Sequence, residues 1–240
     1  MSPPRCVWRD ERTAVFVKPS GQSSEGDPDA LLERSKSLLG WPEARLPHRL
    51  DRITRGYLVV ARDASSVAWH NEAIRARRWI KCYIARLAPR GALQGDAAPL
   101  FGRHKAFLRR VGMRSEVVRS GGDPSFLEVL AVEAAPGRPG ELHAAIRLET
   151  GRFHQIRVML AALGAPLTSD RTYGDRTPGE PMLEHALLSL PVAPSADAPP
   201  ADEKPTRITL FEPHNPDREP VGAGVIAALA SVAGKASATT

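Results

Sequence analysis

The sequence is poor in cysteine and contains no long apolar run. Cys6 and Cys82 are the two cysteines among 240 residues, too few and too far apart to indicate a disulfide framework or a zinc site. No stretch approaches the roughly 18 consecutive apolar residues of a membrane helix, and the N-terminus lacks the basic and apolar regions of a secretory signal. We therefore expect a soluble cytoplasmic protein that does not bind membranes.

Cofactor-binding motifs are also missing. The sequence shows neither a dinucleotide-binding glycine loop, nor a P-loop, nor a cluster of metal ligands. We therefore expect no cofactor and no metal. Hydrophobic residues make up 42% of the chain, which is enough for a folded core and excludes disorder throughout.

Positive charge exceeds negative charge and is unevenly distributed. The chain has 33 Lys and Arg against 27 Asp and Glu, a net charge of +6. This balance favours a polyanionic partner, although most basic clusters are only solvated faces. One cluster holds Arg75, Arg77, Arg78 and Lys81, and a second holds Arg103, Lys105, Arg109, Arg110 and Arg114, with Phe101 and Phe107 interleaved.

Hydrophobic periodicity and the positions of capping and turn residues predict several helices and strands. Asp27-Pro28 reads as the start of a helix that ends at Gly40, and Asp63 as the cap of a helix over about 65–78. In the strand expected from Trp79 to Leu87, Trp79, Lys81 and Tyr83 share one face, while Ile80, Cys82 and Ile84 share the other, which should be buried. Further strands are predicted over Phe126–Val132, Leu142–Leu148 and Arg207–Phe211, the first two as a hairpin. A helix is predicted over 152–163, and an exposed excursion over 191–205. For the region after Pro220, the sequence leaves two alternatives, a loose tail or one poor helix over about 221–233.

The most informative stretch runs from His48 to Gly56. It places Asp51 among the arginines 49, 52 and 55, directly before the apolar run Tyr57–Ala61, which predicts a buried strand. A polar loop held by such a scaffold is a common place for catalytic groups. Taken alone, however, Asp51 is more simply a turn or cap residue.

The run His48-Arg49-Leu50-Asp51, with Thr54 and Gly56, resembles the H-R-L-D-x-x-T-x-G signature of the RluA-type pseudouridine synthases. Other segments resemble family motifs in the same order along the chain. They are Lys18–Gly21, similar to K-P-x-G; Arg77–Ala85, similar to R-x-V-x-K-x-Y-x-A; Thr150–Val158, similar to T-G-R-T-H-Q-I-R-V; and His185-Ala186, similar to part of L-H-A.

The resemblance implies a fold and an active centre. The fold would be α+β, a pseudouridine synthase catalytic core with a mixed, largely antiparallel central sheet flanked by helices. That catalytic domain would cover residues 1–212, and residues 213–240 would form a low-complexity C-terminal tail. Asp51 would assist cleavage of the glycosidic bond, by addition to the sugar or through a glycal, Arg157 would pair with Asp51, and Tyr83 would lie against the uracil. Without the resemblance, Tyr83 would be read as a half-buried strand tyrosine.

The resemblance also assigns supporting roles. Arg49 would enter the base stack as the target uridine flips out, a role that suits a planar guanidinium. RNA contacts are expected from Arg49, Arg52, Arg55, Arg77, Lys81, Arg152 and His154, and structural roles at the site from His48, Thr54, Gly56 and Gly151. Lys81 is equally well explained as a solvated lysine.

The chain departs from the family pattern at several places. Arg55 stands where serine is usual, Phe153 replaces the threonine of T-G-R-T-H, and Met159 and Ala165 stand where histidines are common. None of these changes removes a proposed catalytic group. They indicate a divergent branch and weaken any choice of substrate by analogy.

These observations predict an isomerase, an RNA pseudouridine synthase that flips and modifies uridine in structured rRNA or tRNA. We expect RNA as the partner, no DNA, and a monomer, the family's usual form. An alternative is a catalytically inactive RNA-binding module of the same fold. A third reading, a hydrolase that uses Asp51, lacks a second well-placed carboxylate or a set of metal ligands.

Overall fold

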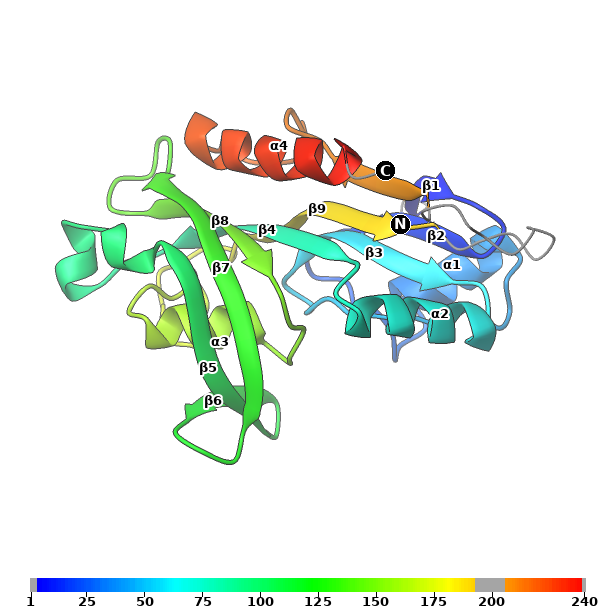
Figure 1. The fold of residues 1–240 in the computed structure, drawn as a ribbon. Helices are drawn as coiled ribbons and strands as arrows, with labels where there is room; N and C mark the ends of the chain where they lie inside the picture. Colours follow the sequence, from blue (N-terminus) through cyan, green and yellow to red (C-terminus); the bar gives the residue numbers. More distant parts are fainter. Residues whose placement is uncertain (1–3, 193–205, 239–240) are drawn as a thin grey trace. The chain divides into compact units, whose positions relative to one another are not determined.

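The computed structural model describes residues 4–192 and 206–238 (Figure 1). The chain divides into two compact units. Unit 1 contains Met1–Ile80, His185–Leu210 and Ala233–Thr240, and unit 2 contains Lys81–Glu184 and Phe211–Val232. Strands and helices occur in both, and every strand pairing whose register is described is antiparallel. The predicted α+β class with a largely antiparallel sheet and flanking helices is confirmed.

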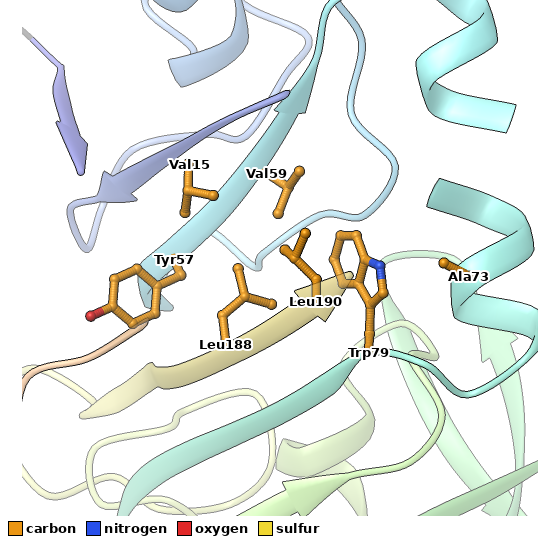
Figure 2. Close-up of a cluster of buried hydrophobic side chains, with 7 residues drawn as sticks. All are labelled: Val15, Tyr57, Val59, Ala73, Trp79, Leu188 and Leu190. Carbon is orange, nitrogen blue, oxygen red and sulfur yellow. The ribbon is translucent and has the colours of Figure 1, made fainter. Parts of the chain in front are cut away.

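Unit 1 is built on strands that follow the order β1-β2-β3-β9, with β10 paired to β9. Its strands and helices are β1 (Arg5–Arg9), β2 (Thr13–Lys18), β3 (Arg55–Ala61), most of β9 (Leu183–Pro191), β10 (Arg207–Phe211), α1 (Leu31–Leu39) and α2 (Ala64–Arg75). The core of the unit forms where alternate strand residues meet α2, because side chains two positions apart share a face of a strand. Figure 2 shows this cluster, which consists of Val15, Tyr57, Val59, Ala73, Trp79, Leu188 and Leu190.

Unit 2 is a five-stranded antiparallel array in the order β4-β8-β7-β5-β6. Its strands are β4 (Ile80–Leu87), β5 (Gly102–Val111), β6 (Arg114–Val118), β7 (Asp123–Ala134) and β8 (Leu142–Leu148), and its main helix is α3 (Gln155–Ala162), with short 3₁₀ turns η1 (Gly91–Gln94) and η2 (Ala98–Leu100). Helix α4 (Ala223–Ala238) begins within this unit along the sequence.

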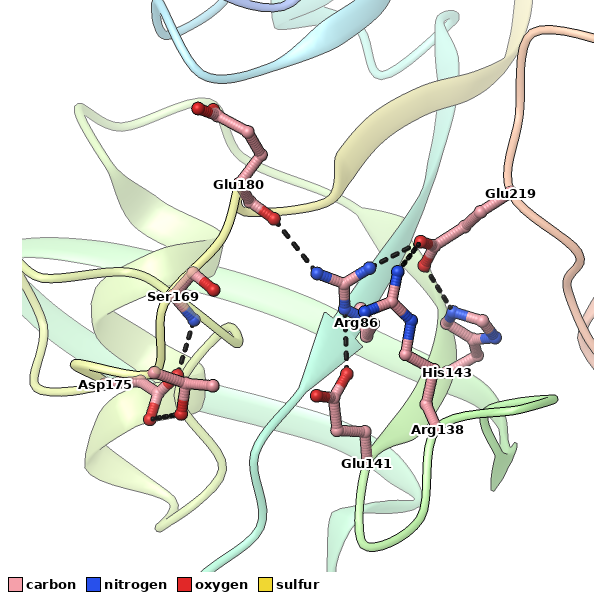
Figure 3. Close-up of polar contacts among 9 residues, drawn as sticks. Arg86, Arg138, Glu141, His143, Ser169, Asp175, Glu180 and Glu219 are labelled. Carbon is pink, nitrogen blue, oxygen red and sulfur yellow. Dashed lines mark hydrogen bonds and ion pairs between the residues drawn. The ribbon is translucent and has the colours of Figure 1, made fainter.

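A network of buried charges joins β4 and β8 to the C-terminal segment, the part of the chain after β10 that contains Glu219. Arg86 on β4 lies 2.9 Å from Glu141 and 2.5 Å from Glu219, and it donates a hydrogen bond to the backbone oxygen of Glu180 (Figure 3). His143 on β8 contacts the second carboxylate oxygen of Glu219 at 3.1 Å. Three acidic or carbonyl partners around one guanidinium compensate for its removal from water.

The C-terminal region resolves one of the two alternatives that its sequence left open. The backbone N–H groups of Gly224 and Val225 donate to the Glu133 carboxylate, which satisfies donors that a helix start leaves without partners. The helix alternative is therefore the observed one, although α4 extends farther than expected. The predicted domain boundary at residue 212 stays a prediction.

Most predicted elements lie where expected, but α1 and α3 begin later than predicted, α3 at Gln155 instead of residue 152. Asp63 caps α2 by accepting from the Ser66 N–H at 2.9 Å, and Gly40 ends α1 in the left-handed conformation. The start at Asp27-Pro28 is wrong, because α1 begins at Leu31. Its first free N–H groups, those of Leu31 and Leu32, donate to the carbonyls of Ser23 and Ser24, so the preceding loop replaces a side-chain cap.

Other differences follow from burial and composition. Strand β4 is buried on both faces, including the face that carries Lys81 and Tyr83, whereas the sequence predicted one buried face. Strands β5 and β6 were not predicted, because their arginines and lysines hide the alternation. The predicted excursion over 191–205 lies mostly outside the described residues. Within those residues, no helix has the length and apolar character needed to cross a membrane.

The burial of His70 predicts that the stability of unit 1 depends on pH. Its ring is fully buried, its Nε2 lies 2.9 Å from the Thr13 hydroxyl, and burial lowers its pKa from 6.5 to about 4. Between these values the unfolded chain binds a proton that the folded chain does not, so folding stability falls as the pH drops from 6.5 to 4. We expect this histidine to account for about 2–3 kcal/mol of that loss.

The test is urea denaturation of the wild type and His70→Gln at pH values from 4 to 7. The variant should lose less stability on acidification than the wild type, and the exposed His214→Gln should behave like the wild type. Equal pH dependence for the wild type and His70→Gln would contradict the assignment.

Candidate active site

The loop that carries Asp51 lies in unit 1, between a bridge from Arg45 to Ala61 and the start of β3. The Asp51 side chain is half-buried. Its backbone oxygen accepts from the Thr54 N–H at 3.0 Å, which closes a turn. One residue earlier, Leu50 exchanges two hydrogen bonds with the buried Ser24 hydroxyl, at 2.8 and 3.1 Å. The carboxylate is thus presented from a loop whose backbone is fixed on both sides.

Lys18, at the end of β2, is the main anchor of this loop. Its fully buried ammonium donates to the carbonyls of Pro19, Gln22 and Arg52, at 2.9, 2.7 and 3.3 Å. Desolvation lowers the pKa of Lys18 to about 8, while the negative charge of Asp51 opposes that shift. Lys18 belongs to the family-like segment Lys18–Gly21, but its role at the site was not predicted from the sequence.

The three arginines around Asp51 have different surroundings. Arg49 is 59% exposed and pairs with Glu25 at 3.0 Å. Arg52 is exposed and donates from Nε to the Gly21 carbonyl at 2.7 Å, while Arg55 is half-buried at the first position of β3. An exposed, planar guanidinium held by a surface carboxylate can exchange that partner for a ligand. The RNA contacts predicted for the three arginines stay predictions.

Two predicted structural residues of the loop, Thr54 and Gly56, are buried in unit 1, and the third, His48, is half-buried. Thr54 is buried, and the His48 Nε2 accepts a hydrogen bond from the Val59 N–H at 3.0 Å. The His48 ring packs edge-on against Trp79 and His185, with centroids 5.3 and 5.8 Å away. Acceptance from a backbone N–H requires an unprotonated Nε2, so this histidine is positioned to support the loop.

Gly56 is required by close backbone approach. A Cβ there would lie 2.3 Å from the backbone oxygen of His185, and the residue has a φ of +110°. The His185 ring nitrogen Nδ1 in turn lies 2.6 Å from the Tyr57 carbonyl. The family-like His185 therefore joins β9 to the strand that follows the Asp51 loop.

The other two predicted catalytic residues lie in unit 2. Tyr83 is buried on β4 opposite Ile146 of β8. Arg157 on α3 is also buried, and its guanidinium forms a two-pronged ion pair with Asp170, with Nε–Oδ2 at 2.7 Å and Nη2–Oδ1 at 2.9 Å. The Arg157 guanidinium also lies over the Tyr173 ring, 5.1 Å from its centroid. Because Asp51 belongs to unit 1, its meeting with Tyr83 and Arg157 stays a prediction.

Asp170 and Tyr173 were not foreseen from the sequence. Both belong to a tight loop in which the Tyr173 N–H donates to the Asp170 backbone oxygen at 3.1 Å. Ser169, immediately before, donates its N–H to Asp175 at 2.5 Å (Figure 3). The only local sign of this loop in the sequence was a polar, glycine-containing segment with one tyrosine. Its contact with α3 cannot be predicted from the sequence.

Lys81 is 7% exposed, so the solvated-lysine reading is excluded. Burial lowers its pKa to about 8, and a Cβ on Gly151 would lie 3.5 Å from its ammonium. Arg152 is exposed and approaches Asp123 at 3.8 Å, and His154, half-buried, begins α3 in the left-handed conformation. Arg77 is an exposed residue of unit 1. The RNA contacts predicted for these four residues remain predictions.

No group of three or more His, Cys, Asp or Glu side chains suited to a metal ion occurs in residues 4–192 and 206–238. Cys6 and Cys82 are free thiols.

The fold and sequence have known counterparts. The human protein named RNA Pseudouridylate Synthase Domain Containing 1 has the same fold, with a TM-score of 0.63 and 24% identity, over 89% of this chain and 85% of that chain. The family model described as RNA pseudouridylate synthase matches residues 12–162, which include the Asp51 loop, β4 and α3. The chain therefore belongs to the RNA pseudouridylate synthase family, and the predicted RluA-type resemblance is confirmed.

Curated relatives are more similar in sequence. The chain is 33% identical over 178 residues to ribosomal large subunit pseudouridine synthase D of Xylella fastidiosa, covering 70% of this chain and 51% of that protein. It is 31% identical over 185 residues to ribosomal large subunit pseudouridine synthase C of Yersinia pestis, covering 71% and 53%. The chain thus matches about half the length of these relatives.

Replacing Gly56 by alanine should disrupt the site's support. The added Cβ would overlap backbone atoms of His185, and backbone cannot move away as a flexible side chain can. We expect a loss in the free energy of unfolding of more than about 3 kcal/mol, measured by urea denaturation.

Gly21→Ala is the matched control. Gly21 also has a positive φ, +83°, but a Cβ there meets nothing within 4 Å. The control should lose only the cost of the left-handed backbone, about 1–2 kcal/mol. If the two variants are equally stable, the close approach of Gly56 to His185 does not contribute to the free energy of unfolding.

Proposed function

We propose that this protein is an RNA pseudouridine synthase that isomerises uridine in ribosomal RNA. The observation that carries the proposal is the half-buried Asp51 on a loop fixed by Lys18 and Ser24, within a chain that belongs to this family. The printed names of the similar bacterial proteins, ribosomal large subunit pseudouridine synthases D and C, favour rRNA over tRNA as the substrate.

In the proposed reaction, the Asp51 carboxylate assists cleavage of the bond between uracil N1 and ribose C1′. The base then turns while bound, and C5 bonds to C1′. C5 loses its proton and N1 gains one, so the product is an isomer of uridine. Arg157, oriented by Asp170, would stabilise the Asp51 carboxylate, because an arginine in a fixed position stabilises charge without reorganising. Tyr83 would pack against the uracil and take part in proton transfer.

The buried surroundings of these groups suit the chemistry. Tyr83, Lys81 and Arg157 are each less than 10% exposed, so a base bound against them would be screened from water. Exclusion of water matters, because a detached base beside an activated sugar could otherwise be lost by hydrolysis. Lys81 would offer an ammonium to a phosphate or carboxylate in the same region.

We further infer that the enzyme works in the cytoplasm as a monomer and binds RNA through its arginines. The positive net charge supports this attraction to polyanions. The inactive-module alternative is disfavoured because Asp51, Tyr83 and Arg157 are all retained.

The decisive experiment compares the wild type with Asp51→Asn on rRNA and tRNA from a strain that lacks the gene, with pseudouridines mapped at nucleotide resolution. The wild type should create new sites in rRNA, and Asp51→Asn should lower the rate at least about a thousandfold. Asp29→Asn, which makes the same change at an exposed residue, should remain active. RNA binding without modification by the wild type would favour the inactive module, whereas released uracil or cut strands would favour a hydrolase.

Arg49→Ala should slow turnover more than it weakens RNA binding. If Arg49 occupies the space of the flipped uridine, its loss raises the cost of flipping, and the single-turnover rate should fall about ten- to hundredfold. The dissociation constant, measured by filter binding, should change by less than about threefold.

The control is Glu25→Gln, which removes the ion-pair partner of Arg49 but leaves the guanidinium in place. This variant should keep the wild-type rate. Equal losses of rate and affinity in Arg49→Ala would instead assign Arg49 to simple phosphate binding.

A further inference from the structure

Phe153, which stands where the family motif has threonine, packs between planar groups in unit 2. Its ring stacks on that of His154, with centroids 3.9 Å apart and planes inclined by 20°. The guanidinium of Arg110, from the end of β5, lies over the same ring at 4.4 Å from its centroid. Three planar side chains from two separate segments are therefore packed together.

This assembly is held in place by the β5–β6 hairpin. The Ser115 hydroxyl donates to the Phe153 carbonyl at 2.5 Å, and the Ser115 N–H donates to the Tyr173 hydroxyl at 2.8 Å. The same Tyr173 oxygen lies 3.0 Å from Nδ1 of His154. These contacts hold the Phe153 carbonyl and the His154 ring, which lie on the C-terminal side of the Phe153 side chain.

His154 has a φ of +55°, an unfavourable conformation for a residue with a side chain. A backbone held in such a conformation by surrounding contacts commonly marks a functional position. Here His154, the residue with this conformation, carries the ring that stacks on Phe153. This favours a role beyond ordinary packing.

The Arg110 end of the assembly faces solvent. Arg110 is exposed, and its Nε donates to the Gly112 carbonyl at 3.0 Å, which orients the plane of the guanidinium. The hairpin tip beside it carries exposed apolar side chains, with Met113 78% and Val111 44% exposed. Exposed apolar side chains next to arginines suit a partner that is both aromatic and anionic.

The chemistry of the tip matches that of a nucleotide. A guanidinium can stack on a base while its N–H groups meet a phosphate, and the Phe153 ring behind the Arg110 guanidinium supports the plane of that guanidinium. Nearby arginines supply further positive charge: Arg109 and Arg114 belong to the same hairpin, and the Arg114 guanidinium lies over Tyr173 at 5.8 Å. A duplex presents phosphates but few free base faces, so this geometry favours an unpaired base.

We propose that Arg110 and Phe153 form a stacking platform for an unpaired base of the RNA substrate. This inference rests on the proposed action on RNA and adds a contact outside the predicted catalytic residues. The platform recognises the face of a base and therefore selects an unpaired segment of RNA, with little preference among the four bases.

The first test uses a 12-nucleotide single-stranded RNA that carries one 2-aminopurine, whose fluorescence is quenched when it stacks. The wild type should quench it, and Arg110→Lys should weaken binding about five- to twentyfold and relieve the quenching, because lysine keeps the charge but lacks the plane. Arg119→Lys, an exposed arginine beyond β6, should match the wild type. Wild-type affinity and quenching in Arg110→Lys would overturn the proposal, since they would assign Arg110 to phosphate binding.

The second test replaces the aromatic ring of Phe153. Phe153→Leu keeps an apolar side chain of similar size and should reproduce the Arg110→Lys loss, while a urea denaturation curve checks that the variant is folded. Phe153→Tyr keeps the aromatic plane and should restore binding and quenching. If Phe153→Leu also binds and quenches like the wild type, the platform does not exist.

Modification assays separate this proposal from the proposed function. At subsaturating rRNA, the single-turnover rate of Arg110→Lys should fall in proportion to its loss of RNA affinity, because the platform binds RNA and does not take part in the reaction. A much larger fall in that rate would overturn the assignment as a binding platform. If the wild type forms no pseudouridine but still quenches the oligonucleotide, the proposed function fails and the platform stands.

Discussion

The Asp51 loop depends on a buried ammonium. Removing the Lys18 charge from water carries a penalty of several kcal/mol, and its three carbonyl contacts offset this penalty only in one arrangement of two loops. One loop follows β2, and the other carries Asp51. A displacement of either loop would leave a buried charge without partners, so the cost of burial becomes a constraint on the position of the proposed catalytic group.

Unit 2 uses the same physical solution with a different cation. Arg157 lies on a short helix that alone could not fix a long side chain, but the two oxygens of Asp170 bind Nε and Nη2 along one edge of its guanidinium. Asp170 is itself fixed by the turn that includes Tyr173. Around Arg86, Glu141 and Glu219 play the equivalent part for the C-terminal segment. Buried cations with several acceptors thus order the loops that strand pairing leaves free.

Local patterns predicted the parts of the fold that depend on local physics. The Asp63 cap, the Gly40 stop and the apolar strand after Gly56 each follow from neighbouring residues. The start of α1 was missed because carbonyls from residues 23 and 24 replaced a side-chain cap. Asp170 was missed because its importance comes from a contact with Arg157. Asp51, Tyr83 and Arg157 were chosen as catalytic residues from the family resemblance, because hydrophobic periodicity does not identify catalytic residues.

One departure from the family pattern, Phe153, lies where it can alter recognition without removing a proposed catalytic group, whereas Met159 and Ala165 are buried. Phe153 lies between Arg152, which is exposed, and the helix that carries Arg157, and its ring packs toward Arg110 at the hairpin. A threonine there could not offer a face to a guanidinium, so the value of an arginine at position 110 depends on the aromatic residue at 153. The buried anchors, by contrast, tolerate little change, because each change would leave a charge unsatisfied. If the proposed function holds, a charge-paired interior and an adjustable arginine-rich hairpin would allow related proteins to share one catalytic framework and to bind different RNA targets.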